Sequence, residues 1–340
     1  MKNIIWPILA LCFLAAIPVG TSQEESSHPI VNLVVDVSAT SPASQEQAMA
    51  ERENLKNIYN ALLGTPSTMF LTKNVSSSQI ALYITQLGLY GNFEFGMSGN
   101  DSDEKLSSMS YEDQKAILKS SKEYAESCHV CGENSMPILG FRPQSYDQDQ
   151  DTYRVLDEMG IEYNVGFQSG LIFEPGHDQD VWPYTVEGYN FYAVPVSTYN
   201  LSGEKLVLQD SYFKEDGLSG SQWYDALVGK LSEIQGKDEP LVIVLTAPVS
   251  GSGDYLDALN NFIAYAKSKN ASFVTSKQLV DMAKLGVRDV SALPGVPECK
   301  TCGNDGSSIN TETSNIDAEN IISVTGNTSQ QIANASEEKS

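Results

Sequence analysis

Histidine is scarce in this sequence, and its scarcity limits the metal chemistry the chain can support. The 340 residues include three histidines, His28, His129 and His177. No two of them stand four residues apart, the spacing at which one helix presents two imidazoles to a zinc ion. The sequence therefore excludes a zinc hydrolase site built on a helix-borne histidine pair.

Basic residues are also few. Lysine and arginine total 21 against 44 aspartate and glutamate residues, which gives a formal net charge of −23. A surface this negative repels nucleic-acid phosphates and anionic lipid headgroups. We therefore expect no nucleic-acid partner and no electrostatic docking to membranes.

Long apolar runs are absent except near the amino terminus. Residues 4–17 are apolar apart from Pro7, follow Lys2, and precede the small or polar residues 20–22. A membrane-spanning helix needs about 20 apolar residues, so this run is short for one. It is typical of a signal peptide over residues 1–22 that carries Cys12 away, with an uncleaved anchor as the alternative. The protein is then secreted or cell-surface, and it meets a membrane only through that segment if the segment is retained.

Aromatic residues are missing from the other end of the chain. Residues 303–340 are rich in Ser, Thr, Asn, Gly and Glu, a composition that predicts a disordered tail over 304–340. Of six Asn-x-Ser/Thr sequences, at Asn74, Asn100, Asn200, Asn270, Asn327 and Asn334, the two in this tail are the best candidates for glycosylation. Between the ends we expect a linker at 23–30, one domain at 31–290 and a cysteine-containing clip at 291–303.

The central segment alternates short apolar runs with helix-like stretches, which is typical of βα units around a parallel sheet. We predict strands at residues 31–35, 68–72, 92–95, 138–141, 163–167, 191–194, 241–245 and 272–275. We predict helices at residues 45–63, 77–87, 110–127, 150–159, 221–234, 254–269 and 276–284. This pattern favours a (β/α) barrel, with functional residues on the loops that follow the strands, including the long loop 166–189.

Five segments, taken in order, resemble the polysaccharide deacetylase family, the NodB-homology domain. They are VNLVVD at 31–36, PSTMFL at 66–71, FEFG at 93–96 with SYEDQ at 110–114, GFRP at 140–143 with VLDEMGI at 155–161, and LVIVL at 241–245 with FVT at 273–275. The resemblance implies a distorted (β/α) barrel, a divalent metal on an Asp-His-His triad, and removal of acetyl groups from amino sugars. It also implies that Asp36 is the base and that Arg142 orients it.

The metal ligands that the resemblance implies are missing from this sequence. Val37 stands where the second aspartate is expected, and Ser98 and Ser102 stand where two histidines are expected. Thr246 or Ala247 occupies the position of the histidine that protonates the leaving amine. Without these side chains, a zinc or cobalt site of the family type is not expected.

Three interpretations follow. The domain binds carbohydrate or a cell-envelope glycan with its hydrolytic centre lost; or it is a divergent carbohydrate deacetylase; or it is a structural envelope protein. A divergent enzyme could recruit Asp101 and Asp103 with Asp36, and such hard oxygen ligands suit calcium or manganese. His177, Trp182 and Tyr184, in the loop 166–189, are candidates for ligand binding.

The remaining cysteines form two identical CxxCG motifs, Cys128 with Cys131 and Cys299 with Cys302. Four thiolates in two such pairs are typical of a structural zinc site, and an exported protein could instead pair them as disulfides. A redox role is disfavoured because Cys128 follows a predicted helix carboxyl end, where the dipole opposes a thiolate. Either linkage would clip the chain end to the barrel.

Overall fold

The computed structural model describes residues 28–38, 44–74, 93–128, 130–131, 134–135 and 137–294, with the side chains of residues 45, 48, 128, 130–131 and 134–135 left out. The predicted signal segment, the helix at 77–87, most of the clip and the tail therefore lie outside the described residues, as do the side chains of all the cysteines. In the part of the chain that is described, no helix is long and apolar enough to span a bilayer.

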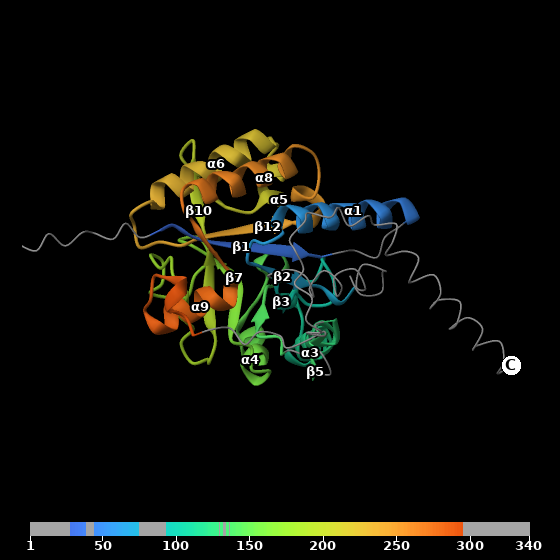
Figure 1. The fold of residues 1–340 in the computed structure, drawn as a ribbon. Coiled ribbons are helices and arrows are strands. Elements are labelled where there is room, and N and C mark those ends of the chain that lie inside the picture. Colours follow the sequence, from blue (N-terminus) through green and yellow to red (C-terminus); the bar gives the residue numbers. More distant parts are fainter. Residues whose placement is uncertain are drawn as a thin grey trace, which may run out of the picture. The chain divides into compact units, whose positions relative to one another are not determined.

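A nine-stranded, largely parallel sheet forms the centre of the fold (Figure 1). Its strands are β1 (Ile30–Val37), β2 (Ser67–Leu71), β3 (Phe93–Met97), β6 (Gly140–Phe141), β7 (Tyr163–Gln168), β8 (Tyr184–Thr185), β9 (Tyr192–Val196), β12 (Leu241–Thr246) and β13 (Ser272–Val274). Two hairpins stand apart, β4 (Val130–Cys131) with β5 (Asn134–Ser135) and β10 (Thr198–Leu201) with β11 (Glu204–Val207).

The strand order is β12-β1-β2-β3-β6-β7-β9-β8, and only β8 pairs antiparallel. Seven parallel strands thus follow one another, and backbone hydrogen bonds link the region after β9 to β12 without a continuous ladder. Ser197 N donates to Val242 O at 3.0 Å, and Val244 N donates to Leu208 O at 3.0 Å. The predicted (β/α) barrel is confirmed in this distorted form, with a seam between β9 and β12.

The eighth predicted strand, β13, does not take an eighth place around the barrel. It pairs with β1 over Ile30 to Asn32, whereas β2 pairs with β1 from Val34 onward. The eight-residue β1 is long enough to hold both partners in succession along the same edge.

Helices cover the outer face of the strands. They are α1 (Gln45–Leu62), α3 (Tyr111–Cys128), α4 (Gln150–Glu158), α5 (Asp210–Glu215), α6 (Gly220–Ile234), α7 (Ala247–Ser250), α8 (Gly253–Ser268) and α9 (Ser276–Leu285), with 3-10 turns at Leu106–Ser108, Gln144–Tyr146 and Val290–Ala292. Figure 1 shows α1, α6 and α8 along one side of β1 and β12, with α3 and α4 beyond β2 and β3. Capping boxes start α4, α6 and α9 at Asp149, Ser219 and Thr275, as short polar side chains do at helix starts.

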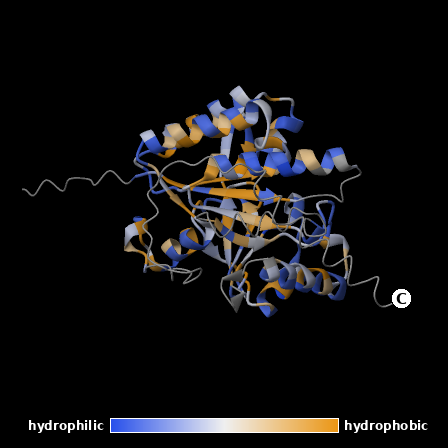
Figure 2. Ribbon diagram, turned by 45° about the vertical axis from the view of Figure 1, so that its right-hand side comes forward, coloured by the Kyte–Doolittle hydropathy of each residue, from blue (hydrophilic) through white to orange (hydrophobic). Residues whose placement is uncertain are grey.

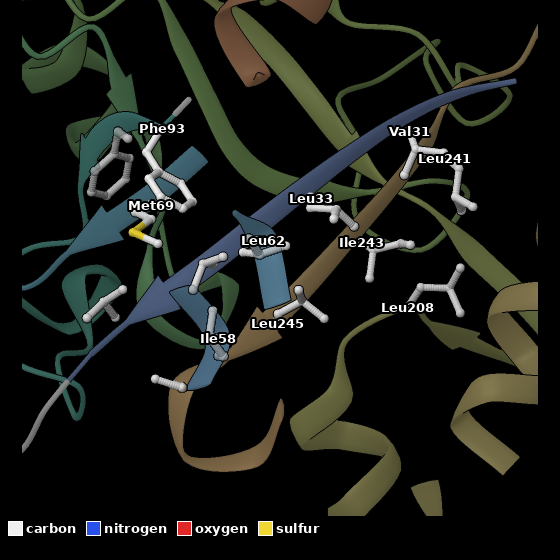
Figure 3. Packing of buried hydrophobic residues seen from close by; sticks show 14 of the residues in the cluster. Val31, Leu33, Ile58, Leu62, Met69, Phe93, Leu208, Leu241, Ile243 and Leu245 are labelled. Carbon is white, nitrogen blue, oxygen red and sulfur yellow. The ribbon is translucent and has the colours of Figure 1, made fainter. Parts of the chain in front are cut away.

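Alternate residues of each strand enter two separate cores. Val31, Leu33 and Val35 of β1 pack outward in the cluster that holds Ile58 and Leu62 of α1 (Figure 3). The other face of the same strands forms a second cluster lined by valines and aromatic residues. Strands buried on both faces carry nearly continuous apolar sequence, which Figure 2 shows as an orange centre inside helices with hydrophilic outer faces.

The amino end of the barrel is covered by α9, which contributes Leu279, Val280 and Met282 to the second cluster. Its first turn binds Glu94 of β3, because Lys277 N donates to Glu94 Oε2 at 2.9 Å. Tyr163 Oη donates to Glu94 Oε1 at 2.6 Å, and burial raises the pKa of this carboxyl. The amino end of the barrel is thus closed by α9, and the carboxyl ends of the strands lie at the opposite end.

Candidate functional site

Two glycines explain the motifs FEFG and GFRP. A Cβ on Gly96 of β3 would lie 2.4 Å from a ring carbon of Phe70, and a Cβ on Gly140 of β6 would lie 2.2 Å from Tyr163. The two rings meet edge to face, with centroids 6.3 Å apart. The bulky rings fill the barrel at this level because both neighbouring strands carry glycine, and they form a platform below the next layer of side chains.

Asp36 and Arg142 belong to that next layer. Each lies two residues beyond a residue of the interior, Val34 in β1 and Gly140 in β6, so the two side chains converge at the carboxyl ends of their strands. Arg142 Nε lies 3.5 Å from Asp36 Oδ2, and the side chains are 0% and 5% exposed. The structure therefore brings together the two residues to which the resemblance assigns the base and its orienting arginine.

Arg142 is held on several sides. Its Nη1 donates to Val165 O at 3.1 Å, and its Nη2 donates to Gln209 Oε1 at 3.0 Å. The guanidinium carbon lies 4.7 Å from the centre of the Tyr146 ring. Burial alone would lower the pKa of Arg142, and the neighbouring Tyr146 and Asp36 raise it, so the net shift is upward and the guanidinium stays charged.

Tyr146 reaches this position through an unusual backbone. Ser145 and Tyr146 have φ of 52° and 59°, in the left-handed region that residues with side chains seldom adopt. The Tyr146 hydroxyl donates to Gln209 Oε1 at 2.9 Å, and burial raises its pKa to about 12. Strain of this kind persists where surrounding contacts hold it, and it is common at functional sites.

Within the described residues, several buried polar atoms at this end of the barrel have no hydrogen-bond partner. They are Asp36 Oδ1, Thr72 Oγ1, Gln144 Nε2 and Arg142 Nε, the last of which has only its 3.5 Å ion pair with Asp36 Oδ2. Thr72 directly follows β2, the strand that pairs with β1 through Val37 and Leu71, and Gln144 stands two residues after Arg142. Buried polar atoms are nearly always paired, so these are the atoms at which a ligand, a water or another part of the chain would complete the hydrogen bonds.

The residues at the expected ligand positions bond to the chain itself. Ser98 Oγ donates to Arg142 O at 2.8 Å, and Ser102 Oγ lies 3.4 Å from Asp101 Oδ1. Thr246, opposite Asp36 in the β1–β12 register, donates to Asp210 from both its amide and its hydroxyl. This donor set does not fit the Asp-His-His metal triad that the resemblance implies.

Asp210 was not anticipated from the sequence. It begins α5 with 0% exposure and also accepts from Ser250, whose hydroxyl donates at 2.6 Å and whose amide donates at 3.2 Å. Burial raises the pKa of Asp210 to about 6. The signal available in the sequence was an aspartate after the apolar Val207 and Leu208, where helices commonly begin.

Hydrogen bonds to other segments hold the acidic loop after β3, which carries Asp101 and Asp103. Asn74 Nδ2 donates to Asp101 Oδ2 at 2.7 Å, and Ser121 of α3 donates to Gly99 O at 2.6 Å. Across the described ranges, no three His, Cys, Asp or Glu side chains form a group that could hold a metal ion. Asp101 and Asp103 therefore do not join Asp36 in such a group.

The three candidates in the loop after β7 make their contacts with residues other than Asp36. His177 stacks on Tyr184 with ring centroids 3.9 Å apart, and its Nδ1 lies 2.6 Å from Asp180 Oδ2. Trp182 Nε1 donates to Asp238 Oδ1 at 2.9 Å, and the Arg288 guanidinium lies 3.9 Å from its ring centre. Asp238 precedes β12, whereas Asp36 pairs with Thr246 at the far end of that strand. From Leu241 to Thr246 the strand alone spans about 16 Å, at about 3.3 Å per residue.

A cavity of about 300 Å³ opens next to the Asp36 layer. Its lining residues are Leu206, Val207, Tyr212, Phe213, Glu215 and Asp216. The Tyr212 ring lies 6.2 Å from that of Tyr146, and the charges of Arg142 and Asp36 both influence its pKa, which burial raises. Tyr212 therefore connects this cavity to the buried ion pair.

Neither a protein-family model nor a curated protein sequence matches the chain. Solved structures do match. A Mycobacterium smegmatis protein assigned as a polysaccharide deacetylase aligns with a TM-score of 0.60 and 17% identity, over 78% of this chain and 93% of that one. The allantoinase PuuE aligns with a TM-score of 0.59 and 16% identity, over 75% and 90%. A Pseudomonas aeruginosa PAO1 protein assigned as a polysaccharide deacetylase aligns with a TM-score of 0.57 and 16% identity, over 75% and 90%.

These likenesses define a class of fold, a distorted parallel (β/α) barrel with its polar layer at the carboxyl ends of the strands. The chain has the polysaccharide deacetylase fold, as its sequence motifs predict. At these identities the likeness establishes the fold alone.

Proposed function

We propose that this exported protein binds carbohydrate at the carboxyl-end face of its barrel without hydrolysing it. The observation that carries the proposal is the group of buried polar atoms near Asp36 and Arg142 that have no hydrogen-bond partner among the described residues, beside the cavity lined by Tyr212. Sugar hydroxyls both donate and accept hydrogen bonds, and an aromatic ring packs against the apolar face of a pyranose. Two solved structures with the same fold are assigned as polysaccharide deacetylases, which supports carbohydrate as the ligand class.

The proposed loss of hydrolysis follows from the side chains that would have to transfer protons. Cleavage of an acetamide needs an activated water and an acid that protonates the leaving amine. Thr246 or Ala247 stands at the position of that acid, and the Thr246 hydroxyl donates to Asp210 at 3.0 Å. Asp36 could still act as a base, whereas neither Thr246 nor Ala247 has a side chain that can protonate an amine.

The binding test is calorimetric titration of the full chain with chitotetraose, an oligosaccharide of N-acetylglucosamine. Tyr212→Ala should weaken binding by about tenfold or more, since aromatic contacts are worth about 0.5–1.5 kcal/mol beyond the area they bury. Tyr224→Ala, a partly buried tyrosine on α6 outside the cavity, is the matched control. Allantoin serves as a second ligand because an allantoinase shares the fold. Binding of allantoin and not of chitotetraose or other oligosaccharides would overturn the proposal.

The catalytic test measures acetate released from chitotetraose in the presence of Zn²⁺, Co²⁺, Mn²⁺ or Ca²⁺. We expect none above the no-enzyme rate. Retention of the Asp36–Arg142 pair favours a divergent deacetylase as the second candidate function. Acetate release that is abolished by Asp36→Asn would establish that alternative and refute the non-hydrolytic proposal.

We also propose export with removal of residues 1–22, and a clip formed by Cys128, Cys131, Cys299 and Cys302 through zinc or disulfides. Intact mass of the protein recovered from the envelope or medium of its producing cells should show an amino terminus near residue 23. Metal analysis with thiol titration should find either one zinc, lost in Cys299→Ser, or two oxidised pairs. Four free thiols without metal would contradict the clip.

A further inference from the structure

A second cavity, of about 200 Å³, lies near the seam between β9 and β12 and is not used by the function proposed above. Its lining residues are Ser169, Gly170, Asp178, Gln179, Val181, Thr198, Asn200, Lys205, Lys230, Glu233 and Glu239. They come from the loop after β7, the hairpin β10–β11, the helix α6 and the residues just before β12. Nearly all of them are polar, so the cavity is suited to a ligand rich in hydrogen-bonding groups.

Hydrogen bonds within the chain hold the walls in place. Ser169 N donates to Val196 O at 2.9 Å, and Ser169 Oγ donates to Asp180 O at 3.2 Å. Thr198 Oγ1 donates to Ser169 O at 3.0 Å, which joins the hairpin to the loop. A cavity whose walls are tied together costs little conformational entropy when a ligand enters.

The charged groups of the cavity nearly balance. Lys230 pairs with Glu239 at 2.5 Å and lies 3.9 Å from Glu233, and the lysine and Glu239 side chains are 12% and 18% exposed. With Lys205 and Asp178, two ammonium groups face three carboxylates. A strongly charged ligand of either sign gains little here, whereas a neutral polyhydroxylated one finds both donors and acceptors.

Lys205 reaches across the cavity because the facing residue is a glycine. A Cβ on Gly170 would lie 2.6 Å from Lys205 Nζ, and Gly170 has φ of +66°. Directly after Gly170, the side chains of Leu171, Ile172 and Phe173 are 43%, 38% and 41% exposed. The polar lining suits the hydroxyl rim of a pyranose, and the three exposed apolar residues that follow Gly170 in the chain offer a surface for its C–H faces.

We propose that this cavity, which includes Asn200 and Lys205, binds one neutral pyranose unit of a saccharide at a site separate from Asp36. The separation follows from β12, since Glu239 precedes its amino end and Thr246, the partner of Asp36, ends it. The seam cavity and Asp36 therefore lie toward opposite ends of β12, so one saccharide chain or two different chains can engage the protein. Binding at the cavity does not depend on binding at Tyr212.

The test uses the full chain in the Tyr212→Ala background, so that the cavity alone responds. Saturation-transfer NMR with N-acetylglucosamine and with glucose as probes should show contact with at least one of the two sugars. Lys205→Met and Asn200→Ala should each weaken that contact about tenfold, the effect of losing one hydrogen bond of about 1.4 kcal/mol. Lys214→Met, an exposed lysine on α5, is the matched control and should leave binding unchanged.

Three results would overturn the proposal. They are no saturation transfer to either sugar, binding that is unaffected by both cavity variants, and equal losses in the Lys214→Met control. If chitotetraose binding depends on Tyr212 while these variants have no effect, the site near Asp36 stands and the second site fails. If the cavity variants weaken sugar binding while Tyr212→Ala has no effect on chitotetraose binding, the second site is supported and the site near Asp36 is not.

Discussion

The buried carboxyl of Asp210 should give the protein a defined dependence of stability on pH. Its two oxygens accept from Thr246 N at 2.8 and 3.0 Å, from the Thr246 hydroxyl at 3.0 Å and from Ser250. Asp210→Asn keeps the shape and most of these bonds, because the amide oxygen can replace Oδ2 and the Thr246 hydroxyl can turn to accept. The variant therefore removes the titrating group with little other change.

The expected magnitude follows from the shift. Burial raises the pKa of Asp210 from 3.8 to about 6, so the folded protein holds a proton that the unfolded chain releases at lower pH. Stability must then fall as pH rises through this interval. At 1.36 kcal/mol per pKa unit, the full loss is about 3 kcal/mol, and most of it falls between pH 4 and pH 7.

The assay is urea unfolding of the full chain and of Asp210→Asn at half-unit steps from pH 4 to pH 7.5. The free energy of unfolding of the wild type minus that of the variant should fall by about 2 kcal/mol and level off above pH 6.5. Taking the difference cancels other titrating groups such as Glu94, whose pKa is also raised by burial. A difference that is flat, or that rises with pH, would refute the assignment of Asp210 as a buried acid with a raised pKa.

Two further predictions concern the layers around the same site. Arg142→Met leaves the carboxylate of Asp36 buried without its cation and should reduce the free energy of unfolding by about 3–5 kcal/mol. Adding Asp36→Asn in a double variant should restore part of that loss. A loss below about 1 kcal/mol in urea unfolding would mean that the pair is hydrated. Gly96→Ala should lower Tm because its Cβ meets the Phe70 ring at 2.4 Å, an overpacking cost of about 1–3 kcal/mol that Phe70→Leu should relieve. An unchanged Tm in Gly96→Ala would show that the interior has more room than the structure gives it.

Much of the fold could be predicted from the sequence, because strand and helix signals are local. Each of the eight predicted strands overlaps an observed one, and the helix predicted at 110–127 is observed one residue later, as α3 (Tyr111–Cys128). The short α5 and the hairpin β10–β11 were missed, since they lack an apolar period long enough to recognise. The pairing of β13 with β1 was not predicted, because it requires that β2 leave the first residues of β1 without a partner.

The candidate site could be predicted only in part. Asp36 and Arg142 stand at the carboxyl ends of their strands, so their meeting there was expected from the motifs VNLVVD and GFRP that contain them. Trp182 was expected on the same face, and it lies instead beside Asp238 and Arg288, because the path of a long loop depends on contacts far away in the chain. The Asp210 contacts with Thr246 and Ser250 span 36 and 40 residues, and no local pattern marks such partners.

By itself, the sequence determined the parallel (β/α) architecture and the absence of the expected histidines, because these follow from local periodicity and residue identity, and the family resemblance implied the Asp36–Arg142 pair. Only the tertiary structure decided what the substituted positions do. It showed that Thr246 donates to a buried acid, that buried polar atoms including Asp36 Oδ1 have no hydrogen-bond partner among the described residues, and that a polar cavity forms near the seam. These features arise where segments distant in the chain meet in space, and side-chain hydrogen bonds and cavities exist only once that packing is complete.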